Sequence, residues 1–188
     1  MTSLLPVGKV GRLLLLLGAC LYIQPAFSPA AAAAPPSELV KVQVIQSLSA
    51  YPQGGAYPLA LKLTIAPGYH LNSNRPQTPE ELPTWVKFYP PQGITLSLPV
   101  FPAPQDFKSP ISGETSKGFS GDILLRTSLA VAPNAAVGLH QIKVVLGYQG
   151  CTGLACLLPE EKAFAFEIKL APAGKPGQRL NQEIFRGK

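Results

Sequence analysis

Two cysteines, Cys151 and Cys156, are the residues of this sequence with the clearest chemistry. Four residues separate them within the stretch 148–161, and the third cysteine, Cys20, lies in an apolar N-terminal segment. If that segment is removed, the mature chain keeps only the pair. Two thiols this close in sequence are able to bond to each other, to exchange their disulfide with a partner, or to hold a soft metal ion.

The spacing of the pair, C-x4-C, narrows these options. It differs from the C-x-x-C of thioredoxin-type proteins and from zinc ribbons, in which two C-x-x-C pairs converge on one metal. A metal site needs more ligands than two thiols and His70 supply, although two thiolates are enough for copper(I). We therefore predict no metal and no other cofactor.

The disulfide itself has two interpretations from the residues alone. In one it is structural and pins the end of a hairpin; in the other it opens reversibly and carries electrons. Cross-linking a loop of six residues stabilises a fold by roughly 2 kcal/mol in the loop-entropy model, which is modest. Small or exposed disulfides are also the more easily reduced ones. These arguments favour a carrier slightly and leave both interpretations open.

The elements that position the cysteines are strands. Apolar residues alternate from Ile142 to Tyr148 before the pair and from Phe164 to Leu170 after it, so the pair lies between two strands. Residues 69–82 are polar and are predicted to form a loop, and 99–118 is the longest irregular segment. The predicted strands are residues 39–48, 57–65, 84–89, 94–98, 119–132, 139–148 and 163–170.

These strands define the fold class. No stretch has sustained helical periodicity, and the 21 prolines of the chain disfavour long helices. Seven or eight strands in about 130 residues predict an all-β antiparallel sandwich. Spacing alone does not separate an immunoglobulin-like sandwich from a jelly roll.

The cysteine stretch also carries a family resemblance. Tyr148-Gln149-Gly150-Cys151, four residues, Cys156 and then a proline with a charged segment resembles the active-site hairpin of the N-terminal periplasmic domain of DsbD, the transmembrane thiol:disulfide interchange protein. The segment 68–72, with 78–80 behind it, is similar to the Gly-aromatic-x-Leu segment that faces the cysteines in that family. The resemblance spans about 38–170 and implies an immunoglobulin-like fold.

The resemblance implies roles for the two cysteines. In the family the second cysteine forms the mixed disulfide with the partner, so Cys156 is expected to attack and Cys151 to resolve. Thiolate fraction and access set the rate of such exchange. No Lys, Arg or His adjoins Cys156 in sequence, while Glu160 and Glu161 follow closely. Local sequence therefore gives no sign of a strongly lowered thiol pKa.

The resemblance also implies that other segments shield the pair and contact the partner. Tyr69, His70 and Asn72 are expected beside the cysteines. In the family a cap loop covers the pair with an aromatic side chain, and Phe107 or Ile111 is the candidate here. The acidic-aromatic-aromatic-Gly form of that cap is absent from the sequence.

Redox partners are implied by the resemblance alone. The sequence after residue 170 has no apolar span and no thioredoxin-like domain, so we expect a separate membrane thiol reductase as electron donor. A thioredoxin-fold disulfide isomerase or a cytochrome c maturation protein is the expected acceptor. Leu157-Leu158-Pro159 replaces the aromatic-Pro-Pro that often follows the second cysteine, which predicts a different choice of partner.

The N-terminus predicts export. Lys9 and Arg12 precede an apolar run of eleven residues, 13–23, which is short against the roughly 20 that span a membrane. We predict a signal peptide over 1–34, a linker over 35–37, the domain over 38–171 and a basic tail over 172–188. Leu17-Gly18-Ala19-Cys20 also resembles a lipoprotein signal, in which case Cys20 is lipidated and anchors the chain to a membrane. Either way the domain is periplasmic or secreted, where disulfides form.

Charge excludes one class of partner. Without Lys9 and Arg12 the net charge falls from +6 to +4, and most of that excess lies after residue 172. The domain is therefore close to neutral and has no basic groove for nucleic acid. The sequence thus predicts a thiol-disulfide exchange module. The alternative is a secreted immunoglobulin-like binding domain whose disulfide is purely structural.

Overall fold

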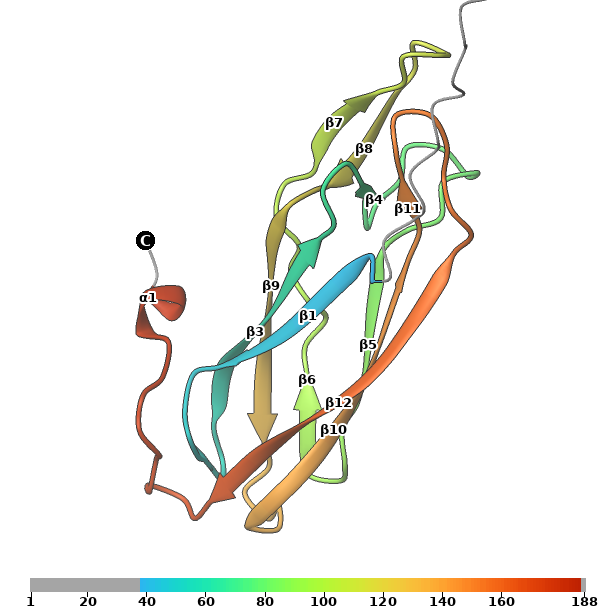
Figure 1. Ribbon diagram of the computed structural model, residues 1–188. Coiled ribbons are helices and arrows are strands. Elements are labelled where there is room, and N and C mark those ends of the chain that lie inside the picture. The colour runs from blue at the N-terminus through green and yellow to red at the C-terminus, as the bar shows by residue number, and fades with distance from the viewer. Residues whose placement is uncertain (1–37, 187–188) are drawn as a thin grey trace, which may run out of the picture. The chain divides into compact units, whose positions relative to one another are not determined.

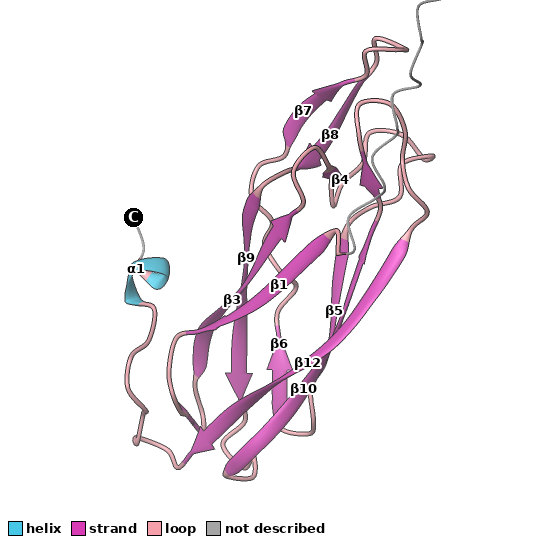
Figure 2. Cartoon of the chain, in the orientation of Figure 1, coloured by secondary structure: helices cyan, strands magenta, loops and turns pink. Residues whose placement is uncertain are grey.

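The computed structural model describes residues 38–186 of the chain. In this range the chain forms strands and one short helix (Figures 1 and 2). The elements are β1 (Val40–Gln46), β2 (Tyr51–Pro52), β3 (Ala56–Ile65), β4 (His70–Asn72), β5 (Trp85–Tyr89), β6 (Ile94–Leu96), β7 (Gln105–Lys108), β8 (Thr115–Phe119), β9 (Asp122–Val131), β10 (Gly138–Tyr148), β11 (Gly150–Cys151), β12 (Glu160–Ala171) and α1 (Gln182–Phe185).

Two four-stranded sheets form the layers of a sandwich. One sheet has the order β1-β3-β9-β6 and the other the order β2-β12-β10-β5. The pairings are antiparallel, apart from a short parallel contact of β2 with β12. This arrangement confirms the predicted all-β, immunoglobulin-like antiparallel sandwich.

The core lies between the two sheets because their strands alternate. In β9, Ile123, Leu125 and Leu129 are buried, whereas Arg126 between them is exposed. The inward side chains of both sheets join one hydrophobic cluster. From β10 and β12 this cluster takes Ile142, Val144, Leu146, Tyr148, Ile168 and Leu170.

A third, smaller sheet with the order β11-β4-β8-β7 extends from the sandwich. It lies at the upper end in Figure 1. Strand β10 ends at Tyr148 and β11 begins at Gly150, and β8 ends at Phe119 shortly before β9 begins at Asp122. The sandwich strands therefore position the third sheet, which contains Cys151.

This third sheet corrects the predicted loops. The segment 99–118, predicted to be irregular, instead contains most of a hairpin in which β7 pairs with β8 from Gln105 and Gly118 to Lys108 and Thr115. The loop predicted over 69–82 contains β4. All four residues of β7 and three of the five in β8 stay partly or fully exposed, so these strands lack the apolar alternation that reveals a strand in sequence.

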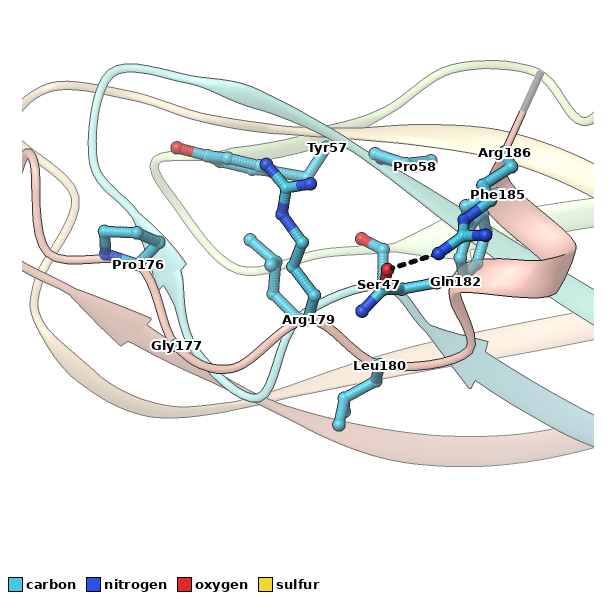
Figure 3. A pocket seen from close by; sticks show the side chains of 11 residues that line it. Ser47, Tyr57, Pro58, Pro176, Gly177, Arg179, Leu180, Gln182, Phe185 and Arg186 are labelled. Carbon is cyan, nitrogen blue, oxygen red and sulfur yellow. Dashed lines mark hydrogen bonds between the residues drawn. The ribbon is translucent and has the colours of Figure 1, made fainter.

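The tail after β12 returns along the turn between β1 and β2. The backbone N–H of Ser49 donates to Gln178, and the N–H groups of Gly177 and Leu180 donate to Ala50 and Ser47, at 2.9–3.0 Å. Together with β3 and α1 the tail encloses a pocket of about 440 Å³ (Figure 3). Its lining includes Leu48, Tyr57, Arg179, Leu180 and Phe185.

The predicted signal peptide, the linker and Cys20 lie outside the described residues. Within residues 38–186, no helix has the length and apolar character needed to cross a membrane.

Candidate functional site

Cys151 and Cys156 form a disulfide with their Cα atoms 3.9 Å apart. The chain between them is a tight turn, in which the N–H of Thr152 donates to the Ala155 carbonyl at 2.8 Å. The Thr152 hydroxyl oxygen accepts the N–H groups of Leu154 and Ala155, as short hydroxyl side chains do in turns. The N–H of Leu157 donates to the Gly150 carbonyl at 2.8 Å and closes the hairpin. The local sequence therefore brings the two sulfurs together.

The two cysteines differ in exposure. Cys151 lies in β11 and is only 2% exposed, whereas Cys156 is among the exposed residues. Strand β11 pairs with β4, so Cys151 lies opposite His70, on the edge strand of the third sheet. On its other side Cys151 meets Cys156 across an isolated bridge. A thiol or disulfide that approaches from solvent therefore reaches the sulfur of Cys156 first.

Asn72 lies behind Cys151 and is 3% exposed. Its Oδ1 is 3.7 Å from the Cys151 Sγ, and its Nδ2 donates to the Leu82 carbonyl and to the Gln149 Oε1. The Gln149 Nε2 in turn donates to the Leu157 carbonyl at 3.0 Å. Sequence reasoning assigned no role to Gln149, although it stands in the motif beside Cys151. These amides connect both sides of the disulfide loop.

His70 and Phe107 stack against each other. Their ring centroids are 4.0 Å apart and their planes differ by 7°. His70 is buried, and this burial lowers the pKa of its imidazole, although Glu81 acts weakly in the opposite direction. The close packing needs Gly118 on β8, because a Cβ there would lie 2.4 Å from the Leu71 carbonyl oxygen. His70 therefore lies beside Cys151 as an uncharged aromatic ring.

Two other predicted site residues, Tyr69 and Ile111, have different surroundings. Tyr69 is half-buried and packs against the main core. Ile111 lies in the turn between β7 and β8 and is 74% exposed. In the same turn, Pro110 lies 3.4 Å from the position of a Cβ on Gly153. The turn of the β7–β8 hairpin thus lies against the loop between the two cysteines, and Pro110 is a contact that sequence reasoning missed.

The charged groups that follow the cysteines are acidic. The Tyr148 hydroxyl donates to the Glu160 carboxylate at 2.6 Å. Burial, together with this carboxylate, raises the pKa of Tyr148 far above its ordinary value, so the phenol stays protonated. Among residues 38–186, no group of three or more His, Cys, Asp or Glu side chains is arranged to hold a metal ion.

Comparison with known proteins identifies a family. Residues 37–168 match the family model of the thiol:disulfide interchange protein DsbD, N-terminal. No curated protein sequence matches the chain.

Two solved structures are similar to this one. One is the DsbD N-terminal domain of Neisseria meningitidis in the reduced form, with 18% identity, a TM-score of 0.46, and coverage of 77% of this chain and 95% of that chain. The other is the N-terminal periplasmic domain of ScsB from Proteus mirabilis, with 13% identity and a TM-score of 0.47. That match covers 73% of this chain and 49% of the ScsB chain.

Proposed function

The chain belongs to the family of the N-terminal domain of the thiol:disulfide interchange protein DsbD, and from this premise we propose that it is a periplasmic thiol-disulfide exchange module. Its Cys151–Cys156 disulfide opens and closes reversibly and passes reducing equivalents to thioredoxin-fold partners. The observation that carries this proposal is the difference in exposure between the buried Cys151 and the exposed Cys156.

The difference in exposure supports the following order of steps. In the reduced module, the Cys156 thiolate attacks one sulfur of the partner's disulfide, and the partner's other sulfur leaves as a thiolate. The Cys151 thiolate then attacks the Cys156 sulfur, restores the internal disulfide and releases the partner's second thiolate. The module loses two electrons and the partner gains them. Cys151 is suited to this second step because its sulfur is hidden from solvent and already lies beside Cys156.

The reverse reaction restores the module. A dithiol of a membrane thiol reductase attacks the exposed sulfur of Cys156, Cys151 leaves as a thiolate, and the reductase closes its own disulfide. A thioredoxin-fold disulfide isomerase or a cytochrome c maturation protein is the acceptor. The stack of the half-buried Phe107 on the buried His70, and the contact of Pro110 with Gly153, support a shielding role for the β4 and β7–β8 segments.

A redox titration tests whether the disulfide is a carrier or a structural cross-link. We expect the pair to titrate near the range of thioredoxin-like proteins, between its donor and its acceptor. A structural disulfide has a reduction potential below about −300 mV. Equilibration with glutathione or dithiothreitol buffers, followed by alkylation and mass spectrometry, measures the reduced fraction. A potential below that limit would favour a binding domain with a purely structural disulfide.

Trapping of mixed disulfides tests the two roles. We expect Cys151→Ser to accumulate a mixed disulfide with a thioredoxin-fold partner, because the thiol that resolves it is gone. Cys156→Ser, with its remaining thiol buried, should trap little. Non-reducing gel electrophoresis with an isomerase as partner shows both species. Equal trapping by the two variants would remove the assignment of roles.

A further inference from the structure

A row of side chains to which the proposed exchange reaction gives no role crosses the outer face of the sheet β2-β12-β10-β5, close to the cysteines. Gly147 of β10 is paired with Trp85 of β5 on one side and with Glu161 of β12 on the other. Side chains paired across antiparallel strands point to the same face. Trp85 and Glu161 therefore flank a position that carries no side chain.

Gly147 allows the indole of Trp85 to lie against the strand. A Cβ on Gly147 would lie 2.2 Å from a carbon of the Trp85 ring, so any other residue would displace the indole. Beside this row is a pocket of about 240 Å³. It is lined by Leu82, Pro83, Trp85, Gly147, Tyr148, Pro159, Glu160 and Glu161.

The pocket is acidic, and the chain's own cations do not neutralise it. Within residues 38–186 neither Glu160 nor Glu161 forms an ion pair. Lys162, the next residue on β12, pairs with Glu38 instead. Lys87, two residues after Trp85, extends over the ring of Tyr89, 5.1 Å from its centroid. The Glu161 carboxylate and the Trp85 indole, which share the outer face, are thus left open to a cation from outside, whereas the Glu160 carboxylate accepts the Tyr148 hydroxyl.

The pocket borders the cysteine site. Leu82 lines the pocket, and its carbonyl accepts a hydrogen bond from Asn72, whose Oδ1 lies 3.7 Å from the Cys151 sulfur. On the other side, Pro159 lines the pocket only three residues after Cys156. A protein whose disulfide reaches Cys156 therefore places its neighbouring side chains over this pocket.

We propose that this pocket takes a lysine or arginine side chain of the redox partner, close in sequence to the partner's reacting cysteine. The inference rests on the proposed exchange function and names a feature of its partner. The indole of Trp85 offers its negatively polarised face to the cation, and Glu161 offers its carboxylate. Glu161, which does not favour a thiolate at Cys156, thereby gains a role in recognition.

Peptide disulfides test the proposal. The probes are short cysteine peptides joined to 2-thiopyridine, in which one lysine is moved from one to five residues away from the cysteine on either side. Matched peptides carry norleucine or glutamate at the same position. The reduced protein attacks the peptide sulfur and releases 2-thiopyridone, whose absorbance gives the rate. At low ionic strength, we expect at least one lysine peptide to react roughly 5- to 10-fold faster than its norleucine counterpart.

Variants locate the effect. Glu161→Gln and Trp85→Leu should each reduce the lysine preference to less than about twofold, while the norleucine peptides keep their rates. Glu161→Lys reverses the charge of the pocket and leaves the indole in place. In this variant the glutamate peptide should react faster than the lysine peptide. Glu167→Gln serves as the matched control, because Glu167 is exposed on the same strand, away from the pocket. Added salt should weaken the preference, since the charges are open to solvent.

The outcomes separate this inference from the exchange function. If all peptides react but lysine and norleucine have equal rates at every position, the pocket proposal is wrong and the exchange function stands. A lysine preference that survives in Glu161→Lys would also overturn it. If no peptide reacts, the exchange function fails and the pocket proposal falls with it.

Discussion

At the residue scale, the side chain of Asn72 joins three parts of the cysteine site. Its amide nitrogen donates hydrogen bonds to the Leu82 carbonyl and to the Gln149 side chain, and its amide oxygen faces the Cys151 sulfur. In the reduced protein this oxygen is placed to accept the Cys151 S–H. An amide is suited to the position because it is neutral and leaves the buried thiol free to ionise during resolution.

Replacement of Asn72 tests this role. We expect Asn72→Asp to raise the pKa of the Cys151 thiol, because the added carboxylate opposes a thiolate beside it. Cys156 should still form its mixed disulfide, but resolution by Cys151 should be slower, by about threefold per unit of pKa shift, because the smaller thiolate fraction is partly offset by a more nucleophilic thiolate. Stopped-flow or quenched-flow measurement with a peptide disulfide separates the two steps. Asn74→Asp, a half-buried neighbour, is the control, and an unchanged resolution rate in Asn72→Asp would contradict the role.

His70 predicts a pH dependence of stability. Its imidazole is buried, which lowers its pKa in the folded chain relative to the value of 6.5 for an exposed histidine. The unfolded chain therefore takes up this proton at higher pH, and the free energy of unfolding should decrease as the pH falls below about 6.5. Above that pH the contribution is fully present.

Urea denaturation between pH 7.5 and 5 measures this slope, in about the range where an ordinary histidine titrates. His70→Gln should flatten the slope, and His140→Gln, at a half-buried position on β10, is the matched control. The carboxylates whose pKa is lowered by lysine neighbours, Glu38 and Asp122, act at lower pH and do not interfere. If the free energy of unfolding depended on pH equally in the parent protein and in His70→Gln, the imidazole of His70 would not be buried in its neutral form.

At the scale of elements, the β7–β8 hairpin is the part of the fold suited to shield the disulfide. It stacks Phe107 on His70 and brings Pro110 close to Gly153, while Ile111 faces solvent. Phe107→Ala should therefore speed the oxidation of the reduced protein by small disulfides several-fold, and Ile111→Ala should add little. Alkylation of free thiols at successive times follows the oxidation, and circular dichroism confirms that the fold is intact. An unchanged rate in the double variant would reject the shielding role.

The elements differ in how far the sequence predicts them. Strands β1, β3, β9, β10 and β12 bury alternate side chains, and their predicted ranges agree with the structure to within a few residues. The third sheet escapes prediction because β4 and β11 have only three and two residues, and most of β7 is exposed. The cysteines and Asn72 stand out by motif, but the pairing of β4 with β11 that brings Asn72 to the sulfur depends on tertiary contacts.

At the scale of the whole molecule, the contacts by which the C-terminal tail stabilises the fold lie apart from the cysteine site. The tail donates or accepts backbone hydrogen bonds at Ser47, Ser49 and Ala50, in the turn between β1 and β2. Arg126 of β9 also donates to the Ile184 carbonyl, which holds α1 against the sheet β1-β3-β9-β6. None of these contacts involves a residue of the sheet β11-β4-β8-β7 that holds Cys151.

A chain that ends at residue 171 tests this separation. It loses the three backbone hydrogen bonds of the tail and exposes Leu48 and Tyr57, so its free energy of unfolding should fall by about 2 to 4 kcal/mol. Its rate of exchange with a peptide disulfide should be unchanged, because the cysteine site keeps all its contacts. Lys175→Gln with Arg179→Gln is the control that removes tail charge and keeps the backbone contacts, and it should retain most of the stability. Urea denaturation and the exchange assay measure the two quantities. A slower or faster exchange in the shortened chain would show that the tail and the cysteine site are coupled.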